Sequence, residues 1–166
     1  MTVLTKKDHG WYQGLYEVVN KEKYVGLKKP FYRSSWECRF MSWCDNNPNV
    51  IKWSFESIEI PYVITENGFS KSHRYIPDFY VEILNKQNQL KKFLVEIKPY
   101  NQGPIKNSKN EVYVPKPPKN KNAKALKRYY LEMKTYKKNT LKWNAARSYC
   151  QRNGLEFVIL TKENLF

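Results

Sequence analysis

Two runs of alternating apolar and polar residues, joined by a short polar connector, constrain this chain more than any other feature. The runs cover 75–83 and 91–97. Their apolar positions are Tyr75, Phe79, Val81, Ile83, Phe93, Val95 and Ile97. Alternation with a period of two is typical of a strand that lays one face against a core. We therefore expect two strands, with Asp78, Glu96 and Lys98 together on the other face.

The connector is short enough for the two strands to pair as an antiparallel hairpin that turns near Gln87. A turn there sets Asp78 opposite Glu96, and cross-strand neighbours have Cβ atoms about 4.5 to 5.5 Å apart. Two carboxylates at that distance repel each other unless a cation lies between them, and a hard divalent ion prefers oxygen ligands. Lys98 points into the same space. The arrangement predicts a metal site beside a fixed positive charge, which suits hydrolysis of a phosphodiester.

The charge of the chain indicates a polyanionic partner. The 166 residues include 30 Lys and Arg against 15 Asp and Glu, a net charge of +15. Binding to phosphates releases condensed counterions and so drives association. Aromatic residues, 16% of the chain, supply both a core and surfaces that can lie along nucleic acid. An anionic membrane surface is the competing partner, but no long amphipathic basic helix supports it.

The length of the chain and the composition of its start limit the class of protein that it can be. A chain of this length is expected to form one domain with its own core. The start of the sequence has no apolar region suited to a signal peptide, and no segment is long and apolar enough to span a bilayer, which predicts a soluble, non-secreted protein. Cys38, Cys44 and Cys150 lack zinc-type spacing and are expected to be reduced packing residues.

Residues 1–30 are expected to form a basic N-terminal arm, and residues 31–166 the folded domain. The arm mixes Lys, Tyr, Trp and Gly without a sustained period. Its alternative is a solvated tail that becomes ordered only by packing on the domain.

A helix is predicted to begin at Ser34 and to stop at Asn46-Asn47-Pro48. Ser34 stands three residues before Glu37, as in a capping box. Trp36, Phe40 and Trp43, with Cys44 beside them, form an apolar stripe expected to face the sheet. Glu37 has two interpretations, since it could cap its own helix or extend to the metal site.

The remaining patterns complete an order of helix, three strands, helices and strand. Asn67-Gly68 is a strong turn signal, and Pro77 predicts a bulge or an end to pairing just before Asp78. The long basic, Pro-containing segment 101–122 is expected to be a loop that borders the cleft or a flexible connector. The other predicted elements are a strand over 58–64, a helix over 123–136, a second helix from 139 to Gly154, and a strand over 155–160.

The motif formed by these residues resembles the PD-(D/E)xK nuclease superfamily. It consists of Pro77-Asp78, 17 intervening residues, and Glu96-Ile97-Lys98, preceded by a helix that carries Glu37. The resemblance implies an α/β fold with a restriction-endonuclease-like αβββαβ core, in which helices flank a central mixed sheet. An extra helix and a long basic loop would be added to that core.

A closer resemblance covers about residues 32–165. The segments that carry it are Tyr32-Arg33-Ser34-Ser35-Trp36-Glu37, Asn47-Pro48, Ile60-Pro61-Tyr62, Val95-Glu96-Ile97-Lys98-Pro99, Lys142-Trp143-Asn144-Ala145-Ala146 and Ile159-Leu160-Thr161. They resemble the head completion nucleases of T-even-like tailed phages. This resemblance implies a magnesium-dependent deoxyribonuclease, an endonuclease or exonuclease, that cuts or trims packaged DNA before heads join tails.

The resemblance also implies roles for individual residues. Asp78 and Glu96, with the Ile97 carbonyl, would ligate Mg²⁺, for which Mn²⁺ could substitute. Lys98 would orient or help to deprotonate the attacking water, and Glu37 matches the helix acid that positions a water or a second ion. The residues assigned to DNA contacts are Arg74, Lys98, Tyr100 and Lys142.

The partner implied is double-stranded DNA, with portal or neck proteins as further candidates and no membrane. The implied location is the cytoplasm of the infected bacterial host, with retention in the virion head or neck as a further expectation. We expect weak sequence preference and steep salt dependence, because charge supplies the affinity. Alternatives are a non-catalytic DNA-binding structural head protein and a same-fold endonuclease for restriction or transposition. An RNA-binding domain would leave the carboxylates and Lys98 unexplained.

Overall fold

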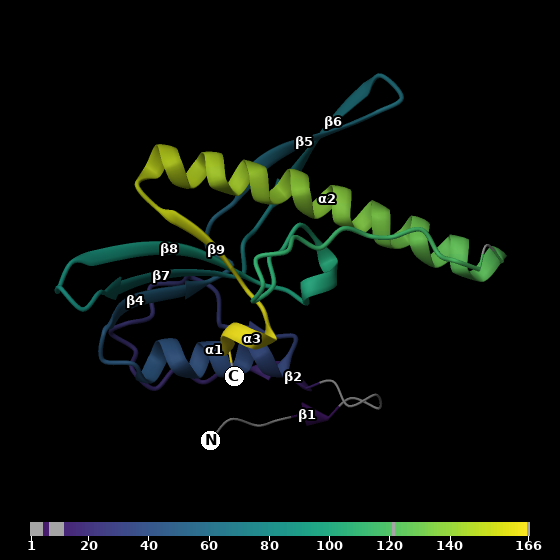
Figure 1. The fold of residues 1–166 in the computed structure, drawn as a ribbon. Helices are drawn as coiled ribbons and strands as arrows, with labels where there is room; N and C mark the ends of the chain where they lie inside the picture. The colour runs from purple at the N-terminus through teal and green to yellow at the C-terminus, as the bar shows by residue number, and fades with distance from the viewer. Residues whose placement is uncertain (1–4, 7–11, 121, 166) are drawn as a thin grey trace.

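A mixed β-sheet lies at the centre of the fold, with a helix against each face (Figure 1). The computed structural model describes residues 5–6, 12–120 and 122–165. Its central sheet has the order β4-β7-β8-β9, in which β9 is parallel to β8 and the other neighbours are antiparallel. The strands are β4 (Val50–Phe55), β7 (Phe79–Leu84), β8 (Leu90–Ile97) and β9 (Glu156–Leu160). The expected mixed sheet between helices is confirmed.

The two alternating runs form a hairpin in the predicted register. β7 pairs with β8 so that Phe79 faces Val95. Extending this register by one residue sets Asp78 opposite Glu96, as a turn centred on Gln87 requires. The hairpin therefore brings the two carboxylates to the same end of the sheet.

Tyr75 does not belong to the same strand as Phe79, contrary to the prediction. β6 ends at Tyr75, and β7 begins only at Phe79. Pairing stops around Pro77, as the proline predicted, because its ring removes a donor. The break places Tyr75 in the core on the opposite face of the sheet from Phe79.

α1 (Ser35–Asn46) covers one face of the sheet. The buried residues between them are Phe40, Met41, Cys44, Phe79, Val81, Val95 and Ile97. Trp43 was predicted to face the sheet, but 45% of it is exposed, and its ring stacks on Phe40. Successive residues of a helix are about 100° apart around its axis. The buried arc of α1 is centred on Met41 and Cys44, so Trp43 lies at the edge of that arc.

α2 (Ala123–Asn153) covers the other face and is one continuous helix, so the prediction of two helices is wrong. Asn139 and Thr140, the polar pair at which a second helix was predicted to begin, lie inside α2. Asn139 is buried, and the Thr140 hydroxyl donates to the Tyr136 carbonyl one turn earlier at 2.8 Å. Gly154 adopts a left-handed conformation (φ 66°) and ends the helix as predicted.

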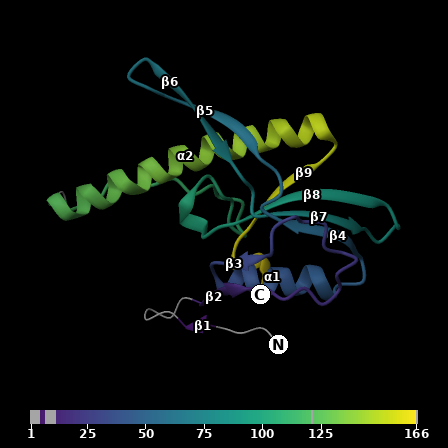
Figure 2. The same ribbon diagram turned by 180° about the vertical axis from the view of Figure 1, so that it is seen from behind.

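A second hairpin, β5 (Ile60–Glu66) and β6 (Phe69–Tyr75), stands apart from the central sheet and packs against α2 (Figures 1 and 2). Its turn at Asn67-Gly68 is confirmed, with φ of 51° and 80°. The first strand of the central sheet is β4, which the sequence patterns did not predict. Most of β4 is buried on both faces, so its side chains do not alternate in polarity.

Residues 12–30 of the predicted arm pack on the domain. β1 (Thr5–Lys6) pairs with β2 (Tyr12–Leu15), which pairs with β3 (Phe31–Tyr32). The rest of the predicted arm, residues 1–4 and 7–11, lies outside the described residues.

Asp45 of α1 anchors this segment. Its buried carboxylate accepts hydrogen bonds from the Tyr16 hydroxyl at 3.0 Å and from the backbone N–H groups of Val19 at 2.8 Å and Asn20 at 3.0 Å. The Asp45 carbonyl also accepts from the Lys23 ammonium at 3.2 Å. One buried acid thus satisfies several donors of a segment that has little regular structure.

The long loop after β8 begins with a short 3₁₀-helix, η1 (Tyr100–Gln102). The Tyr113 hydroxyl donates to Glu132, which ties the loop to α2. The chain ends with α3 (Lys162–Leu165). Cys38, Cys44 and Cys150 are free thiols, as expected. None of the described helices is long and apolar enough to cross a membrane.

Asp45→Asn is expected to lower the free energy of unfolding by about 2–3 kcal/mol, because hydrogen bonds to an ionised group are lost and an amide hydrogen faces other donors. Urea unfolding followed by circular dichroism measures the change. Glu22→Gln, which removes the same charge at an exposed position, serves as the control and should stay within about 0.5 kcal/mol of the parent. An unchanged midpoint for Asp45→Asn would contradict the anchoring role.

Candidate active site at the end of the central sheet

Asp78 is held by the backbone of two neighbouring strands. Its carboxylate accepts a hydrogen bond from the Ile97 N–H at 2.8 Å. Its carbonyl accepts from the Glu56 N–H, just after β4, at 3.0 Å. The position of the acid therefore depends on the register of β4, β7 and β8 rather than on a flexible loop.

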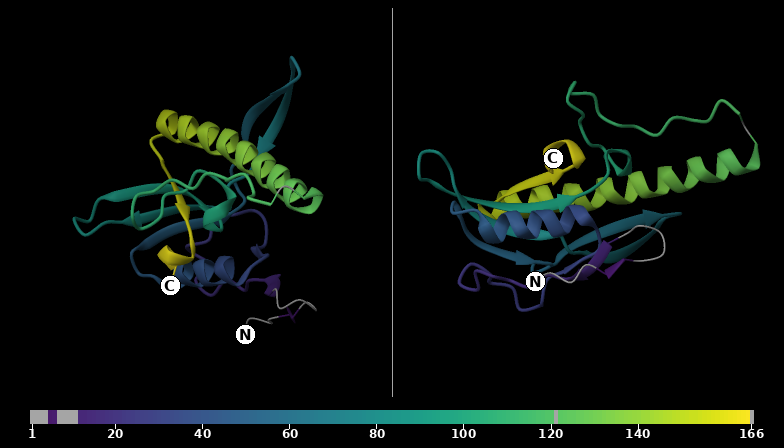
Figure 3. Two further views of the ribbon diagram at one scale, coloured as in Figure 1. Left: turned by 45° about the vertical axis from the view of Figure 1, so that its right-hand side comes forward. Right: turned by 90° about the horizontal axis from the view of Figure 1, so that it is seen from below.

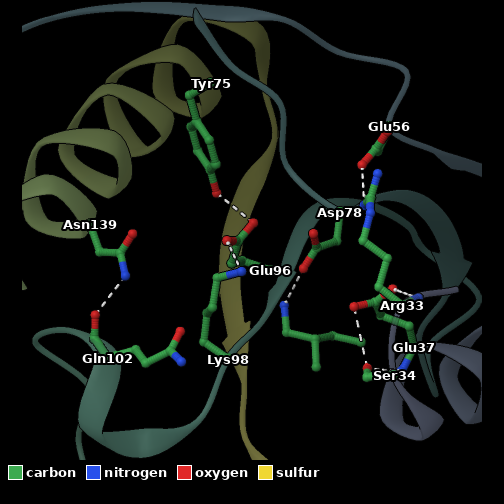
Figure 4. A network of polar contacts seen from close by, with 11 residues as sticks. Arg33, Ser34, Glu37, Glu56, Tyr75, Asp78, Glu96, Lys98, Gln102 and Asn139 are labelled. Carbon is green, nitrogen blue, oxygen red and sulfur yellow. Dashed lines mark hydrogen bonds and ion pairs between the residues drawn. The ribbon is translucent and has the colours of Figure 1, made fainter. Parts of the chain in front are cut away.

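Glu96 lies beside Asp78 and is almost fully buried, with 2% of its surface exposed. One carboxylate oxygen accepts from the Lys98 ammonium at 3.1 Å, and the other accepts from the Tyr75 hydroxyl at 2.8 Å. Figure 4 shows Asp78, Glu96 and Lys98 gathered between Tyr75 on one side and Glu37 on the other. The expected grouping of two acids and one lysine is present.

The two buried acids of this group disfavour each other's ionised form. Burial, and then the charge of Glu96, raise the pKa of Asp78 well above its usual range. Burial alone would lower the pKa of Lys98, but the charges of Glu96 and Asp78 outweigh it and raise that pKa. Lys98 is thus held as an ammonium that offsets only part of the negative charge.

Glu37 combines both interpretations that the sequence left open. It is part of a capping box, since its N–H donates to the Ser34 hydroxyl at 3.2 Å and its carboxylate accepts from the Arg33 N–H at 2.7 Å. Burial raises its pKa, and the hydrogen bonds from Arg33 and Ser34, followed by the charges of Arg33 and Lys98, oppose that rise. The capping bonds therefore fix a partly buried carboxylate at the border of the site.

Of the residues assigned to DNA contacts, Lys98 contacts Glu96 directly, and Lys142 lies next to Tyr75, which donates to Glu96. The Lys142 ammonium lies 5.3 Å from the centre of the Tyr75 ring, and burial lowers its pKa while the charge of Glu96 opposes that change. Arg74 alternates with Tyr75 along β6, is largely exposed and pairs with Glu59 at 3.4 Å. The structure does not bring Arg74 to the acids.

Tyr100 follows the site along the chain but is engaged elsewhere. Its hydroxyl donates to the Glu111 carbonyl at 3.0 Å, and its ring packs edge-on against Tyr113. Ile97 buries its side chain on the α1 side of the sheet, so that only its backbone borders the acids.

The oxygen donors at this end of the sheet fit a hard divalent cation. Asp78 and Glu96 meet beside Lys98, whose single charge offsets only part of theirs, and the Ile97 backbone lies alongside. Mg²⁺ is commonly held by one or two carboxylates and completes its shell with waters and phosphates. In the described part of the chain, no group of three or more His, Cys, Asp and Glu side chains converges to hold a metal. The donor set therefore suits Mg²⁺ better than a closed structural zinc site.

Sequence reasoning missed the residues that support the site from the α2 side. Tyr75, expected as a core residue, is the hydroxyl donor to Glu96. Asn139 donates to the Gln102 carbonyl at 2.6 Å, which fixes η1 shortly after Lys98. Gly103 then packs so closely on the Trp143 ring that a Cβ there would lie 2.3 Å from two ring atoms. In the sequence, the only sign of these contacts was a polar residue, Asn139, within an otherwise helical pattern.

Comparisons with known proteins agree with this geometry. Residues 47–162 match a family model described as TnsA-like endonuclease N terminal. The chain is 37% identical over 155 residues to a protein of Enterobacteria phage T4 named head completion nuclease, and the match covers 93% of each chain. No solved structure matches the chain.

Gly103→Ala is expected to destabilise the protein by about 1–3 kcal/mol, because the added methyl group collides with the buried Trp143 ring. The backbone at Gly103 is extended (φ 176°), so the cost arises from packing rather than from conformation. Urea unfolding measures the loss, with Ser108→Ala in the exposed part of the same loop as the control.

Adding Trp143→Phe removes the ring atoms that collide. The double variant should therefore lose less stability than the sum of the two single changes. Strict additivity would show that the contact between Gly103 and Trp143 is not the cause.

Proposed function

Because the chain belongs to the TnsA-like endonuclease family and to the head completion nuclease family, we propose that it is a metal-dependent nuclease that hydrolyses phosphodiester bonds of DNA. The observation that carries the proposal is the convergence of Asp78, Glu96 and Lys98 at the end of the central sheet. Burying two acids and one ammonium together lowers the stability of the fold. A group of this kind is typical of a functional site, and here it suits a cation and a phosphate.

Mg²⁺ is the proposed cofactor, and Mn²⁺ is expected to substitute for it. Asp78 and Glu96 would hold the ion together with the Ile97 carbonyl. When bound, such an ion supplies a Lewis acid that polarises the scissile phosphate and makes water more acidic. It would also relieve the repulsion that raises the pKa of Asp78.

The residues of the chain have separate tasks in this proposal. Tyr75 donates to one oxygen of Glu96 and so fixes the direction of that carboxylate. Lys98 is an ammonium beside the other oxygen, and we assign it to orienting the attacking water and to offsetting charge on the phosphate in the transition state. Glu37, held by its capping bonds, is assigned to positioning a water.

The biological role proposed is completion of the phage head, by cutting or trimming packaged DNA before head and tail join. Support comes from the T4 relative, whose name states head completion and whose match covers nearly the whole of both chains. Double-stranded DNA is the proposed substrate, with portal or neck proteins as proposed partners. The proposed location is the cytoplasm of the infected bacterium, with retention in the virion head or neck.

Asp78→Asn and Lys98→Ala are expected to abolish cleavage of supercoiled and linear DNA. The first removes a proposed metal ligand, which is worth on the order of 1000-fold in rate, and the second removes transition-state charge, worth at least about 100-fold. Gel assays with magnesium and with EDTA measure the loss. Lys92→Ala is the matched control, since Lys92 lies on the same face of β8 about 20 Å away.

Both variants should still bind DNA, because the net positive charge remains. If the parent protein binds DNA but cuts none with any divalent ion, the non-catalytic structural alternative takes the place of the nuclease.

Addition of Mg²⁺ is expected to raise the unfolding temperature of the parent protein and to leave that of Asp78→Asn unchanged. An ion that binds only the folded state stabilises it by about 2.7 kcal/mol at a concentration one hundred times its dissociation constant. Thermal unfolding monitored by circular dichroism, with and without EDTA, measures the shift. An equal shift in both proteins would place the ion elsewhere.

A further inference from the structure

The β5–β6 hairpin and α2 form the two walls of an open groove of about 870 Å³ that no proposed catalytic residue occupies. Both elements extend beyond the central sheet on the same side of the molecule (Figures 1 and 3). Their side chains line the groove from opposite sides. The groove is thus a feature of the projecting elements and not of the catalytic centre.

The groove is strongly basic. Its cationic side chains are Lys71 from β6 and Lys134, Lys137 and Lys138 from α2. In the part of the chain that the structure describes, these four lysines have no ion-pair partner, and Glu66 is the one acidic side chain in the lining. Lysines that face each other without counter-charges repel, so a bound polyanion would be stabilised there.

Two exposed aromatic residues lie in the same groove. Phe69, at the start of β6, is 82% exposed, and Tyr130 of α2 is 66% exposed. Neither is needed to bury the core. Apolar side chains among lysines suit a partner that has both charged and apolar surfaces, as a nucleic acid does.

The groove leads directly to the candidate active site. Tyr75, which donates to Glu96, ends the same strand that begins at Phe69, a distance of about 20 Å along β6. On the other wall, Lys134, Lys138 and Lys142 follow one another at intervals of four residues, about 6 Å each. Because Lys142 lies over the Tyr75 ring, the basic wall of α2 ends beside the acids.

We propose that this groove holds the phosphate backbone of one strand of the duplex DNA that flanks the cleaved bond on one side. The inference rests on the proposed nuclease function and adds to it a binding surface distinct from the catalytic residues. A length of about 20 Å corresponds to about six base pairs at 3.4 Å each. Lys71, Lys134 and Lys138 contact phosphates, and Phe69 makes an apolar contact at the far end.

An acidic protein is the competing occupant of such a groove. The lysines of α2 favour DNA because they are repeated at a regular spacing in line with the catalytic centre, as phosphates are along a backbone. Contacts of this kind position a duplex without reading its sequence. They would therefore supply both affinity and the direction in which DNA enters the site.

The test measures DNA binding in the Asp78→Asn background, where cleavage cannot interfere. Lys71→Gln, Lys134→Gln and Lys138→Gln are combined and compared with a control of equal charge change, Lys86→Gln, Lys92→Gln and Lys162→Gln. Fluorescence anisotropy with a labelled duplex is recorded between about 50 and 200 mM salt. The groove variant should bind at least tenfold more weakly, and the slope of log affinity against log salt should fall by about two to three units, whereas the control changes little.

Phe69→Ala separates the apolar contact from the charges. It should weaken duplex binding without changing the salt slope, because no phosphate contact is lost. Circular dichroism melting of each variant verifies that the fold is retained.

Equal affinities and slopes for the groove variant and its control would overturn the inference and leave the groove to an acidic protein. A labelled single strand is measured alongside the duplex, and a loss of affinity confined to the single strand would also overturn the inference. Failure of the nuclease proposal is distinguishable, because the parent protein would then bind duplex DNA through the groove but cut none.

Discussion

The fold depends on the register that sets Asp78 opposite Glu96 across β7 and β8. Two acids forced together at the end of a sheet are stable only if each is supplied with donors. The Ile97 N–H, the Tyr75 hydroxyl and Lys98 are those donors, and they come from β8, from the end of β6 and from the residue after β8. Donors from three places in the chain therefore hold one small electrostatic arrangement.

This register was predictable because it depends on local patterns. Alternation fixes which residues share a face, and the length of the polar connector fixes the turn at Gln87, so Asp78 and Glu96 could be paired without a structure. The capping box from Ser34 to Glu37 and the left-handed end at Gly154 are equally local. Each follows from interactions between residues close in the sequence.

What could not be predicted depends on distant partners. Most of β4 is buried on both faces, so its pattern resembles neither a surface strand nor an amphipathic helix. Asn139 looked like the start of a helix because its bond to the Gln102 carbonyl is a tertiary contact between residues far apart. The role of Tyr75 was hidden for the same reason, since a tyrosine near the end of a strand suits a core as well as a hydroxyl donor.

The first half of α2 concentrates much of the positive charge of the chain. Residues 123–142 contain seven basic residues and one acidic residue, Glu132, whose carboxylate is engaged by Tyr113. Lysines four residues apart, such as Lys134 and Lys138, destabilise a helix by a few tenths of a kcal/mol for each pair. The helix forms despite this cost because its other half is anchored by Trp143 in the core. Core packing at one end thus maintains an array of positive charge at the other, which leads from the projecting hairpin to Asp78 and Glu96, the acids of the proposed catalytic site.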